Sequence, residues 1–339
     1  MAAQAFSVAC LGAGYFSQFH YDAWRRIDGA RLTGAADLDL PRAAATGAPA
    51  FAGLSAMLDA GAPDILDIIT KPPTHLDAIR AALDAGVRWI ICQKPFCTSL
   101  DEARQAVALA DAAGARLVVH ENFRFQPWYR FIRAAIADGS VGTVQQVTFR
   151  LRPGDGQGPR AYLDRQPYFQ QMPRLLIHET GVHMIDTFRY LLGAPTAVYA
   201  DLRRINPVIA GEDAGYFLLD HPGGARSLFD GNRHLDHAAA NTRLTMGEAL
   251  VEGDRGTLTL TGDGAVHHRG FGALDAATVL PARAWDSFGG DCVHALQAHV
   301  ADALRTGAPL ENEAASYLGV IEIEEAIYRS ARERRKLEV

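Results

Sequence analysis

Apolar residues in the first third of the chain form short, nearly continuous runs that alternate with amphipathic segments. The runs predict buried strands at 6–11, 31–36, 65–69, 87–92 and 116–119. Apolar residues at helical spacing predict helices at 17–27, 54–60, 74–85 and 99–113. Strands of about four to eight residues without polar alternation are typical of a parallel sheet covered on both faces. This part of the chain is therefore expected to form a doubly wound α/β domain, a Rossmann fold.

Residues that typically end or start helices lie at the boundaries that the hydrophobic pattern predicts in this part of the chain. Three of the predicted helices are followed by Gly61, Gly86 and Gly114, and glycine commonly ends a helix because it tolerates a left-handed backbone. Ser99 and Glu102 have the spacing of a capping box at the start of the helix at 99–113.

The pattern changes after about Arg124. Helices are predicted at 128–137, 175–192, 288–305 and 312–335, with a strand at 144–151. Strand-like runs separated by turn residues read AVYADLRRI, AGYFLLDH, RLTMGEALVEG and GTLTLTG. We therefore expect two domains, a nucleotide-binding domain at 1–123 and an α+β domain with a largely antiparallel open sheet at 124–339.

A long segment rich in Gly, Pro and Arg, RPGDGQGPRAYLDRQPYFQQMPR, interrupts the second domain at 152–174. Long loops inside compact domains are usually functional, so we expect this one to line a substrate pocket. Its multidentate donors and acceptors suit a polyhydroxylated ligand, because a hydrophobic alcohol would leave them unpaired on burial. The expected substrate-binding residues are Arg152, Asp155, Gln166, Tyr168 and, just beyond the loop, His178.

Composition and charge narrow the class of protein. The 339 residues fit about two domains, and 33 Lys and Arg against 39 Asp and Glu give a net charge of −6, without a block of five or more like charges. We therefore expect neither a nucleic-acid nor an anionic-membrane partner. The four cysteines lack CxxC spacing, which favours reduced thiols in a cytoplasmic protein, without disulfides or a zinc site. The start MAAQAFSVACLGAG resembles neither a signal peptide nor a membrane span.

Two glycines indicate a nucleotide-binding turn. Gly12 and Gly14 lie between the first strand and the first helix, where they allow a tight turn and leave the helix N-terminus open to a pyrophosphate. Ser17 stands where the third glycine of the GxGxxG motif would be, which weakens the signal. The alternative interpretation is an ordinary helix cap in a turn.

Asp37 ends the second predicted strand, about twenty residues after the glycines, where a carboxylate can accept hydrogen bonds from the ribose hydroxyls of NAD. Asp39 follows closely, so the 2′-phosphate of NADP would meet two negative charges. NAD is the expected cofactor. The alternative is that Asp37 is an ordinary acid at a strand end.

Three further residues could perform hydride-transfer chemistry. Oxidising a secondary alcohol requires a base for the hydroxyl proton and a cation to stabilise the alkoxide, and His183 and Lys94 could supply these. On a regular helix Glu179 and His183 share one face, so the carboxylate could orient the imidazole or bind a substrate hydroxyl, while His178 points elsewhere. The alternatives are a hydrogen-bonded core histidine for His183 and a solvated lysine for Lys94.

The motifs GAGYFSQFH, ITKPPTHLDAI, QKPFCTSLDEA, ENFRFQP and HETGVHMID, in this order, resemble the Gfo/Idh/MocA oxidoreductases over nearly the whole chain. The resemblance implies a Rossmann domain, an α+β domain that often mediates oligomerisation, and NAD(P)-dependent oxidation of sugars or polyols. Gln93 stands where the family usually has Glu, and Glu179 where it usually has Asp. The cofactor-side residues that the resemblance and the motifs assign are Gly12, Gly14, Tyr15, Phe16, Asp37, Thr70, Pro72, His75, Gln93, Lys94 and Asn122.

The expected function is an NAD-dependent dehydrogenase of a sugar or polyol that acts as a homo-oligomer, a dimer or tetramer. Within the family, ICQKP, VHENFRFQ and GEDAG are most similar to the D-apiose dehydrogenase group. Two alternatives are an NAD-retaining sugar-modifying enzyme that uses transient oxidation and a non-catalytic NAD(H)-dependent sensor.

The segment at 70–75 could also be a Pro-rich turn with a helix cap at Thr74. The pairs His267–His268 and His234–His237 are expected to be exposed loop histidines, not metal ligands.

Overall fold

The computed structural model describes residues 5–285 and 287–339, and its contacts divide the chain into two compact units. The first unit comprises the residues up to Asn122 together with Val293–Leu318, and the second comprises Phe123–Cys292 and Gly319–Val339. The expectation about the start of the chain concerns in part residues 1–4, which lie outside the described residues.

The first unit contains a six-stranded sheet in which every neighbouring pair of strands is parallel. The strand order is β3-β2-β1-β4-β5-β6, so the chain moves outward from β1 in one direction and then returns to continue on the other side. The strands are β1 (Phe6–Leu11), β2 (Ala30–Ala36), β3 (Ala50–Phe51), β4 (Ile65–Ile68), β5 (Trp89–Gln93) and β6 (Arg116–His120). The predicted doubly wound fold is thus confirmed.

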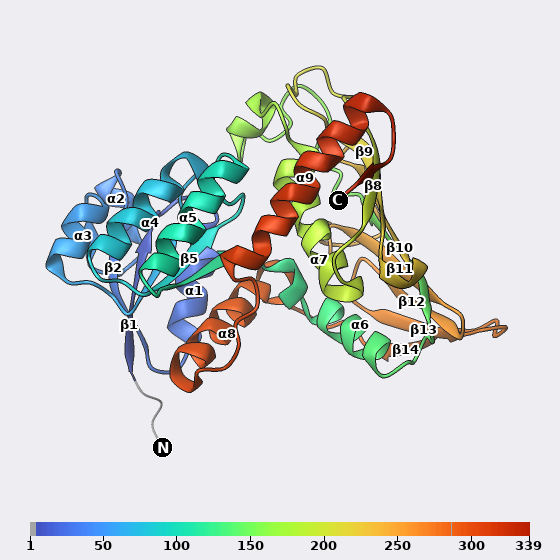
Figure 1. Ribbon diagram of the computed structural model, residues 1–339, viewed down its shortest axis with the longest axis horizontal. Coiled ribbons are helices and arrows are strands. Elements are labelled where there is room, and N and C mark those ends of the chain that lie inside the picture. Colours follow the sequence, from blue (N-terminus) through green and yellow to red (C-terminus); the bar gives the residue numbers. More distant parts are fainter. Residues whose placement is uncertain (1–4, 286) are drawn as a thin grey trace. The chain divides into compact units, whose positions relative to one another are not determined.

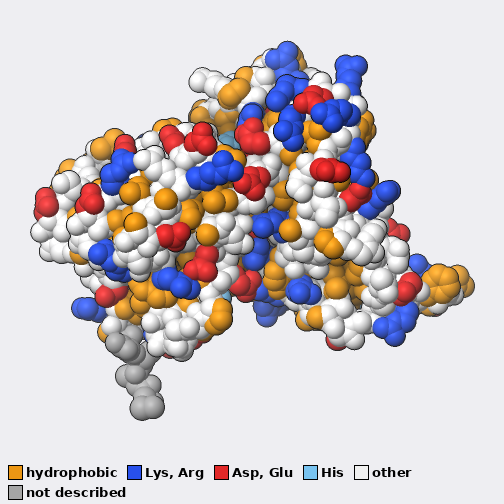
Figure 2. Space-filling view, in the orientation of Figure 1, with side chains coloured by type: hydrophobic (Ala, Val, Ile, Leu, Met, Phe, Trp, Pro, Cys, Tyr) orange, Lys and Arg blue, Asp and Glu red, His pale blue; other side chains and the backbone are white. Residues whose placement is uncertain are grey.

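Helices cover this sheet. They are α1 (Ser17–Arg26), α2 (Leu40–Ala45), α3 (Leu54–Ala60), α4 (His75–Asp84) and α5 (Leu100–Ala112), and Figure 1 shows α3, α4 and α5 side by side in blue and teal. Lys and Arg side chains are interspersed with Asp and Glu over this surface in Figure 2, in agreement with the absence of blocks of five or more like charges in the sequence. Ser99 accepts a hydrogen bond from the backbone amide of Glu102, as predicted, whereas Glu102 reaches back to Thr98 and not to Ser99.

From Val293 onward the helix α8 (Cys292–Thr306), together with the start of α9 (Ala314–Glu333), groups with the first unit. The Gln297 amide donates to Asp67 in β4 at 3.1 Å, and the Asn312 amide donates to the Glu121 carbonyl at 2.6 Å. This division differs from the single domain expected at 124–339. The contacts attach 293–318 to the Rossmann unit, which a pattern along the chain does not reveal because the partners are distant in sequence.

The second unit contains a nine-stranded sheet of order β14-β13-β12-β11-β7-β10-β9-β8-β15. Only the pairing of β7 with β10 is parallel among the pairs that the structure describes, so the predicted largely antiparallel sheet is confirmed. The strands are β7 (Val144–Leu151), β8 (Ala197–Arg203), β9 (Ala214–Asp220), β10 (Arg226–Asn232), β11 (Gly247–Gly253), β12 (Gly256–Leu260), β13 (Val266–Gly270), β14 (Ala277–Leu280) and β15 (Leu337–Glu338).

One face of this sheet is buried beneath α6 (Pro127–Ala137) and α7 (Val182–Leu192), which lie on the same side of it in Figure 1. Alternate residues of β10 are buried, as the period of a strand with one covered face requires. Phe229 stacks on Phe217 with ring centroids 4.9 Å apart, and Phe149 is 6.4 Å from Phe229. These rings form a fully buried centre for the unit.

The predicted helix at 175–192 differs in kind from the expectation. Residues Leu176–Gly181 form a π-helix, and the α-helix α7 begins only at Val182. A π-helix is wider than an α-helix, because its hydrogen bonds join residues five apart, and hydrophobic periodicity does not identify it. Glu179 and His178 lie in this π-helix and His183 lies in α7, so the face that Glu179 and His183 were expected to share on one regular α-helix does not apply.

Candidate functional site

The glycine turn after β1 has the backbone that the sequence predicted. Gly12 has a φ of +112°, and a Cβ at this position would lie 3.1 Å from the Ile69 carbonyl carbon, so only glycine fits without strain. A Cβ on Gly14 would meet open space. The Ser17 hydroxyl, buried at the start of α1, donates to the Gly14 carbonyl at 2.7 Å. Ser17 thus holds the turn closed where the motif usually has glycine.

Asp37 lies directly beside this turn. Its Oδ2 accepts a hydrogen bond from the Ala13 amide at 2.8 Å, and its Oδ1 accepts one from the Asp39 amide at 2.9 Å. The Gly12 amide donates to the Ala36 carbonyl at 2.7 Å, which joins the ends of β1 and β2. The carboxylate is therefore fixed next to the glycine turn, where ribose recognition requires it.

The segment after β4 forms a tight turn leading into α4. The Thr70 and Thr74 hydroxyls are 2.6 Å apart, and Pro72 begins a short 3-10 turn. The His75 ring Nε2 is 2.9 Å from the Thr70 carbonyl oxygen. Burial lowers the pKa of His75 to about 4, although the bond to Thr70 acts in the opposite direction. His75 is therefore neutral at neutral pH and braces the turn that carries Thr70.

The remaining cofactor-side candidates also follow strands of this sheet. Lys94 comes directly after β5, its amide donates to the Gln93 side-chain oxygen at 3.3 Å, and the Lys94–Pro95 peptide is cis. Asn122 follows β6 and is buried. Tyr15 and Phe16 lie between the glycine turn and α1, with Tyr15 exposed and Phe16 packed edge-on against Phe19 at 5.2 Å. All these residues lie at the carboxyl edge of a parallel sheet with a switch in strand order, which is where such folds bind nucleotides.

In the second unit, His183 and Glu179 lie on consecutive elements. His183 is in the first turn of α7, 6% exposed, and its ring stacks on Phe123 with centroids 3.9 Å apart and planes 2° apart. Its backbone carbonyl accepts a bond from the Thr187 hydroxyl. Glu179 lies in the π-helix. The stack fixes the plane of the imidazole, which a base for proton transfer needs.

Several residues of the predicted substrate loop are joined into one hydrogen-bonded chain. Asp155 accepts from the Arg165 guanidinium at 3.1 Å, Arg165 donates to Gln166 at 3.1 Å, and the Gln166 amide donates to the Tyr168 hydroxyl at 3.2 Å. Burial and then the charge of Glu179 raise the pKa of Tyr168. Tyr168 is therefore a neutral hydroxyl at neutral pH, close enough to Glu179 to sense its charge.

Two other predicted substrate residues are held by different partners. The Arg152 guanidinium is buried and bonds to the Asp230 carboxylate and to the Asp230 carbonyl, the latter at 2.7 Å. The His178 ring Nδ1 is 2.7 Å from the buried carboxylate of Glu324 in α9. The structure thus gathers Asp155, Gln166, Tyr168 and Glu179, and gives Arg152 and His178 partners outside that chain.

The expectation of exposed loop histidines was wrong. His267 and His268 lie within β13 and are partly buried. His234 is 2.9 Å from the buried Asp213 carboxylate, and His237 is buried with its Nδ1 2.8 Å from the Arg152 carbonyl. Within the described residues, no group of three or more His, Cys, Asp or Glu side chains could hold a metal ion.

Sequence reasoning missed two buried polar clusters. In the first unit the Asp67 carboxylate is bonded to His20 at 2.8 Å and to the Trp24 indole at 2.8 Å. Burial would raise the pKa of Asp67, but His20 and its other partners hold it below its usual value. In the second unit Arg233 is 2% exposed. A charged residue inside an apolar strand signalled the first cluster, whereas only the fold reveals the partners of Arg233.

The residues around the glycine turn fit NAD. Three features of the first unit support this: the open space at Gly14, the α1 N-terminus, which no side chain among the described residues caps, and the fixed carboxylate of Asp37. The turn can accept a pyrophosphate and the carboxylate a ribose diol, since an uncapped helix start offers backbone N–H donors.

Two family models match the chain. Residues 6–121 match the Gfo/Idh/MocA oxidoreductase family with its NAD-binding Rossmann fold, and residues 129–259 match the Gfo/Idh/MocA C-terminal domain. The chain belongs to this family. The predicted resemblance and the NAD cofactor are thereby confirmed, and the chain is an oxidoreductase with an NAD-binding Rossmann domain.

Individual relatives cover nearly the full chain. It is 35% identical to a D-apiose dehydrogenase of Paraburkholderia graminis, over 98% of this chain and 90% of that protein. It is 29% identical to a D-apiose dehydrogenase of Rhizobium rhizogenes, over 98% and 96%. A crystal structure of an oxidoreductase from Agrobacterium radiobacter, in complex with NAD+, L-tartaric acid and magnesium, is 28% identical with a TM-score of 0.89 and covers 99% of this chain and 98% of that one.

Proposed function

We propose that this protein is an NAD-dependent dehydrogenase that oxidises a hydroxyl of a sugar or polyol. The observation that carries the proposal is the 35% identity, over nearly the whole chain, to a protein named D-apiose dehydrogenase. A relative named inositol 2-dehydrogenase, from Rhizobium meliloti, is 29% identical over 67% of this chain. Both names describe oxidation of polyhydroxylated compounds. The substrate loop, with its chain of donors and acceptors from Asp155 to Tyr168, fits a ligand of this kind.

Bound NAD supplies the acceptor for the hydride. In the first unit Gly12, Gly14 and Asp37 would hold the cofactor, with Tyr15, Phe16, Thr70, Pro72, His75, Gln93 and Asn122 beside it. The Lys94 ammonium would donate to the reacting oxygen and stabilise it as its proton leaves. His183, held in one plane by Phe123, would accept that proton at a ring nitrogen.

In the second unit Glu179 would orient a substrate hydroxyl, and Tyr168 and Gln166 would donate to others. Arg152 and Asp155 would shape the loop behind them, and His178 would form part of the pocket wall. For the substrate itself we propose a branched aldose such as D-apiose, on the names of the two relatives that match this chain almost completely.

We also propose a cytoplasmic homo-oligomer, a dimer or tetramer. The four cysteines are all buried free thiols, which supports a reducing compartment. Among the helices that the structure describes, none combines the length and apolarity needed to cross a membrane.

The test is a substrate screen followed by two substitutions. Purified protein is incubated with NAD and D-apiose, D-glucose, D-xylose, myo-inositol or a sugar acid, and NADH is followed by absorbance. We expect NADH from a sugar or polyol, and Lys94→Ala and His183→Ala should lower kcat about 10² to 10⁴-fold while the protein still binds NAD. Wild-type kcat in either folded variant would contradict the assigned roles.

The same screen separates the alternatives. Robust NADH from another sugar, with none from D-apiose, would discard D-apiose and retain the dehydrogenase. A sugar product formed without net NADH would indicate an enzyme that retains and recycles its cofactor. Binding of NAD(H) without conversion of any sugar would favour a sensor.

A further inference from the structure

Arg233 is an unusual residue in the second unit, because its long charged side chain is almost completely buried. It follows β10 directly and is 2% exposed, which places it among the largest fully buried side chains of the chain. An arginine in such a place is destabilising unless its charge and its N–H groups are matched by partners. The identity of these partners indicates what the residue does.

The guanidinium of Arg233 joins two segments that are distant in sequence. Its Nη2 and Nε donate to the Asp155 carboxylate at 2.9 and 3.2 Å, and Nε also donates to the Tyr162 hydroxyl at 2.7 Å. Its Nη1 donates to the Thr180 hydroxyl at 2.8 Å. Asp155 and Tyr162 belong to the substrate loop, whereas Thr180 belongs to the π-helix and is the neighbour of Glu179.

The electrostatics of the cluster agree with these contacts. Burial would lower the pKa of Arg233, but Asp155 and Tyr162, with a contribution from Glu179, raise it above its usual value. Burial would raise the pKa of Asp155, but Arg233 and Arg165 hold it below its usual value. Both groups therefore stay charged over the working pH range, and Glu179 is close enough to contribute to the field.

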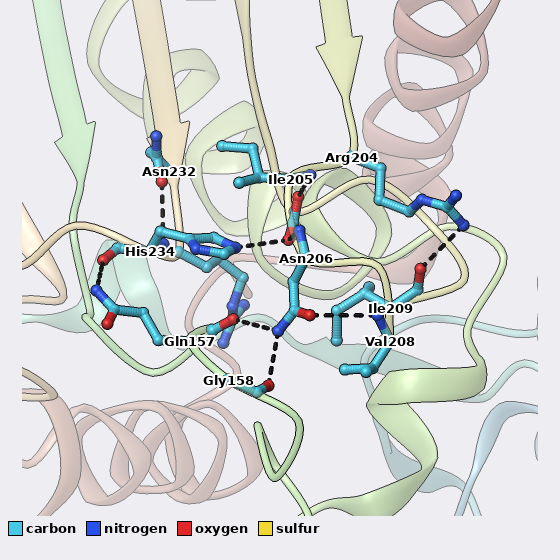
Figure 3. Close-up of polar contacts among 12 residues, drawn as sticks. Gln157, Gly158, Arg204, Ile205, Asn206, Val208, Ile209, Asn232 and His234 are labelled. Atoms are coloured by element: carbon cyan, nitrogen blue, oxygen red, sulfur yellow. Dashed lines mark hydrogen bonds and ion pairs between the residues drawn. The ribbon is translucent and has the colours of Figure 1, made fainter.

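A separate contact set holds the start of the loop. The Asn206 side-chain amide donates to the Gly156 and Gly158 carbonyls at 2.8 and 2.9 Å. Asp213 accepts from the Asn206 backbone amide at 2.8 Å and contacts His234 at 2.9 Å. Figure 3 shows Asn206 between Gly158 and His234, with Gln157 bonded to the His234 backbone. Weakening Arg233 would therefore leave the loop attached here and loosen its later residues.

The later part of the loop carries the hydrogen-bonded chain that ends at Tyr168. Asp155 anchors Arg165, Arg165 anchors Gln166, and Gln166 donates to Tyr168. The position of Tyr168 relative to Glu179 thus depends on Asp155, and both Asp155 and the π-helix depend on Arg233.

We propose that Arg233 is a positioning residue that fixes the substrate loop against the π-helix, so that the polar groups of the loop and Glu179 meet a sugar in one arrangement. This rests on the proposed function for its link to a sugar substrate. The arrangement itself is a property of the second unit and can be measured without turnover.

The first test is amide hydrogen exchange without ligand. In Arg233→Lys, which keeps the charge but not the forked geometry, we expect faster exchange in the residues at 160–171 and 177–181. Exchange in β7 and at residues 205–209 should stay as in the wild type. Arg130→Lys is the matched control, since Arg130 donates to Tyr190 and stacks on Phe125, two residues outside the loop. Unchanged exchange in both segments of Arg233→Lys would overturn the proposal.

The second test uses kinetics and a double-mutant cycle. We expect Arg233→Lys to lower kcat/KM for the sugar about 10 to 100-fold and to leave the Kd of NAD unchanged. Asp155→Asn and Thr180→Val each remove one side of the link, and their combined effect should differ from the product of the single effects several-fold. In the Arg233→Lys background this coupling should disappear. The proposal would be contradicted if the effects of Asp155→Asn and Thr180→Val were independent in both the wild-type and the Arg233→Lys background. It would also be contradicted if the fraction of unfolded protein explained the whole loss of kcat/KM.

These outcomes are distinguishable from a failure of the proposed function. If the wild type oxidises none of the sugars tested, the proposed function fails, and the exchange experiment still decides whether Arg233 orders the loop. If the wild type is active and the Arg233→Lys variant matches it in exchange and kinetics, the positioning role fails and the proposed function stands.

Discussion

Asp37 is the residue expected to distinguish NAD from NADP. Its carboxylate is held beside the glycine turn by the amides of Ala13 and Asp39. A carboxylate in this place accepts bonds from a ribose diol and repels a 2′-phosphate. Its two oxygens are already oriented by the backbone, so little reorganisation is needed when a ribose binds.

We therefore expect Asp37→Ser to lower kcat/KM for NAD by about 10 to 100-fold, the value of a hydrogen bond to a charged group. The ratio of kcat/KM for NADP to that for NAD should rise, because the repulsion is removed. Steady-state kinetics with both cofactors measures this. Asp64→Ser, at the far end of the sheet where Asp64 bonds to Ser7, is the control and should change neither value. An unchanged cofactor ratio in Asp37→Ser would refute the assignment.

His75 makes the stability of the first unit sensitive to acid. Its pKa is about 4 in the folded chain against 6.5 for an unperturbed histidine, chiefly because it is buried. Between these values the unfolded chain binds a proton that the folded chain does not. The contribution of neutral His75 is complete above pH about 6.5 and is lost as the pH falls toward about 4.

The unfolding free energy of the wild type should fall when the pH is lowered from 7 to 5. We expect this fall to be about 2 kcal/mol smaller in His75→Gln. Urea unfolding at both pH values, without NAD, is the measurement. Equal losses in wild type and His75→Gln would show that this histidine does not carry the effect.

At the scale of elements, the sequence predicted those whose signal is local. The buried runs of β1, β4 and β6 and the helix α3 lie within a residue of the predicted bounds, because continuous apolar character is enough to mark them. The strand β3 has only two residues and α2 only six, too few for a period to be recognised. The π-helix at Leu176–Gly181 has no local signature, so the relation between Glu179 and His183 could not be predicted.

The candidate site divides in the same way. Gly12, Gly14, Asp37 and Lys94 could be placed from sequence, because each follows a strand and strands of a parallel sheet end at one edge. The role of Arg233 could not be predicted from sequence. Its partners Asp155 and Thr180 lie far from it along the chain and contact it only in the folded second unit. Contacts between segments that are distant along the chain depend on the topology of the fold, and local patterns in a single sequence do not identify them.

The turn between β1 and α1 offers a test at this scale. Gly12 has a positive φ and close contacts with the backbone after β4, whereas Gly14 has neither. Gly12→Ala should lower the unfolding free energy by about 1 to 3 kcal/mol, the cost of a strained backbone. Gly14→Ala should stay within about 0.5 kcal/mol of the wild type. Denaturant unfolding without NAD measures both, and equal stabilities would show that the turn is not strained by a side chain at Gly12.

At the scale of the whole molecule, the two units divide the proposed work. Every residue assigned to the cofactor side belongs to the first unit, and the substrate loop with Glu179 and His183 belongs to the second. Each unit has its own sheet and its own buried core. Substitutions in the loop should therefore alter recognition of the sugar without altering the site that holds NAD.

Gln166 and Tyr168 give the sharpest form of this prediction. Tyr168→Phe removes a hydroxyl whose pKa is raised by burial and by Glu179, and Gln166→Ala removes the amide that donates to it. Each should raise KM for the sugar about 10-fold, the value of a hydrogen bond to a substrate hydroxyl. The Kd of NAD, measured by calorimetry, should stay as in the wild type. Substitutions that instead raise the Kd of NAD and leave KM for the sugar unchanged would place the loop on the cofactor side. A lost contact affects most strongly the binding of the ligand that the side chain touches.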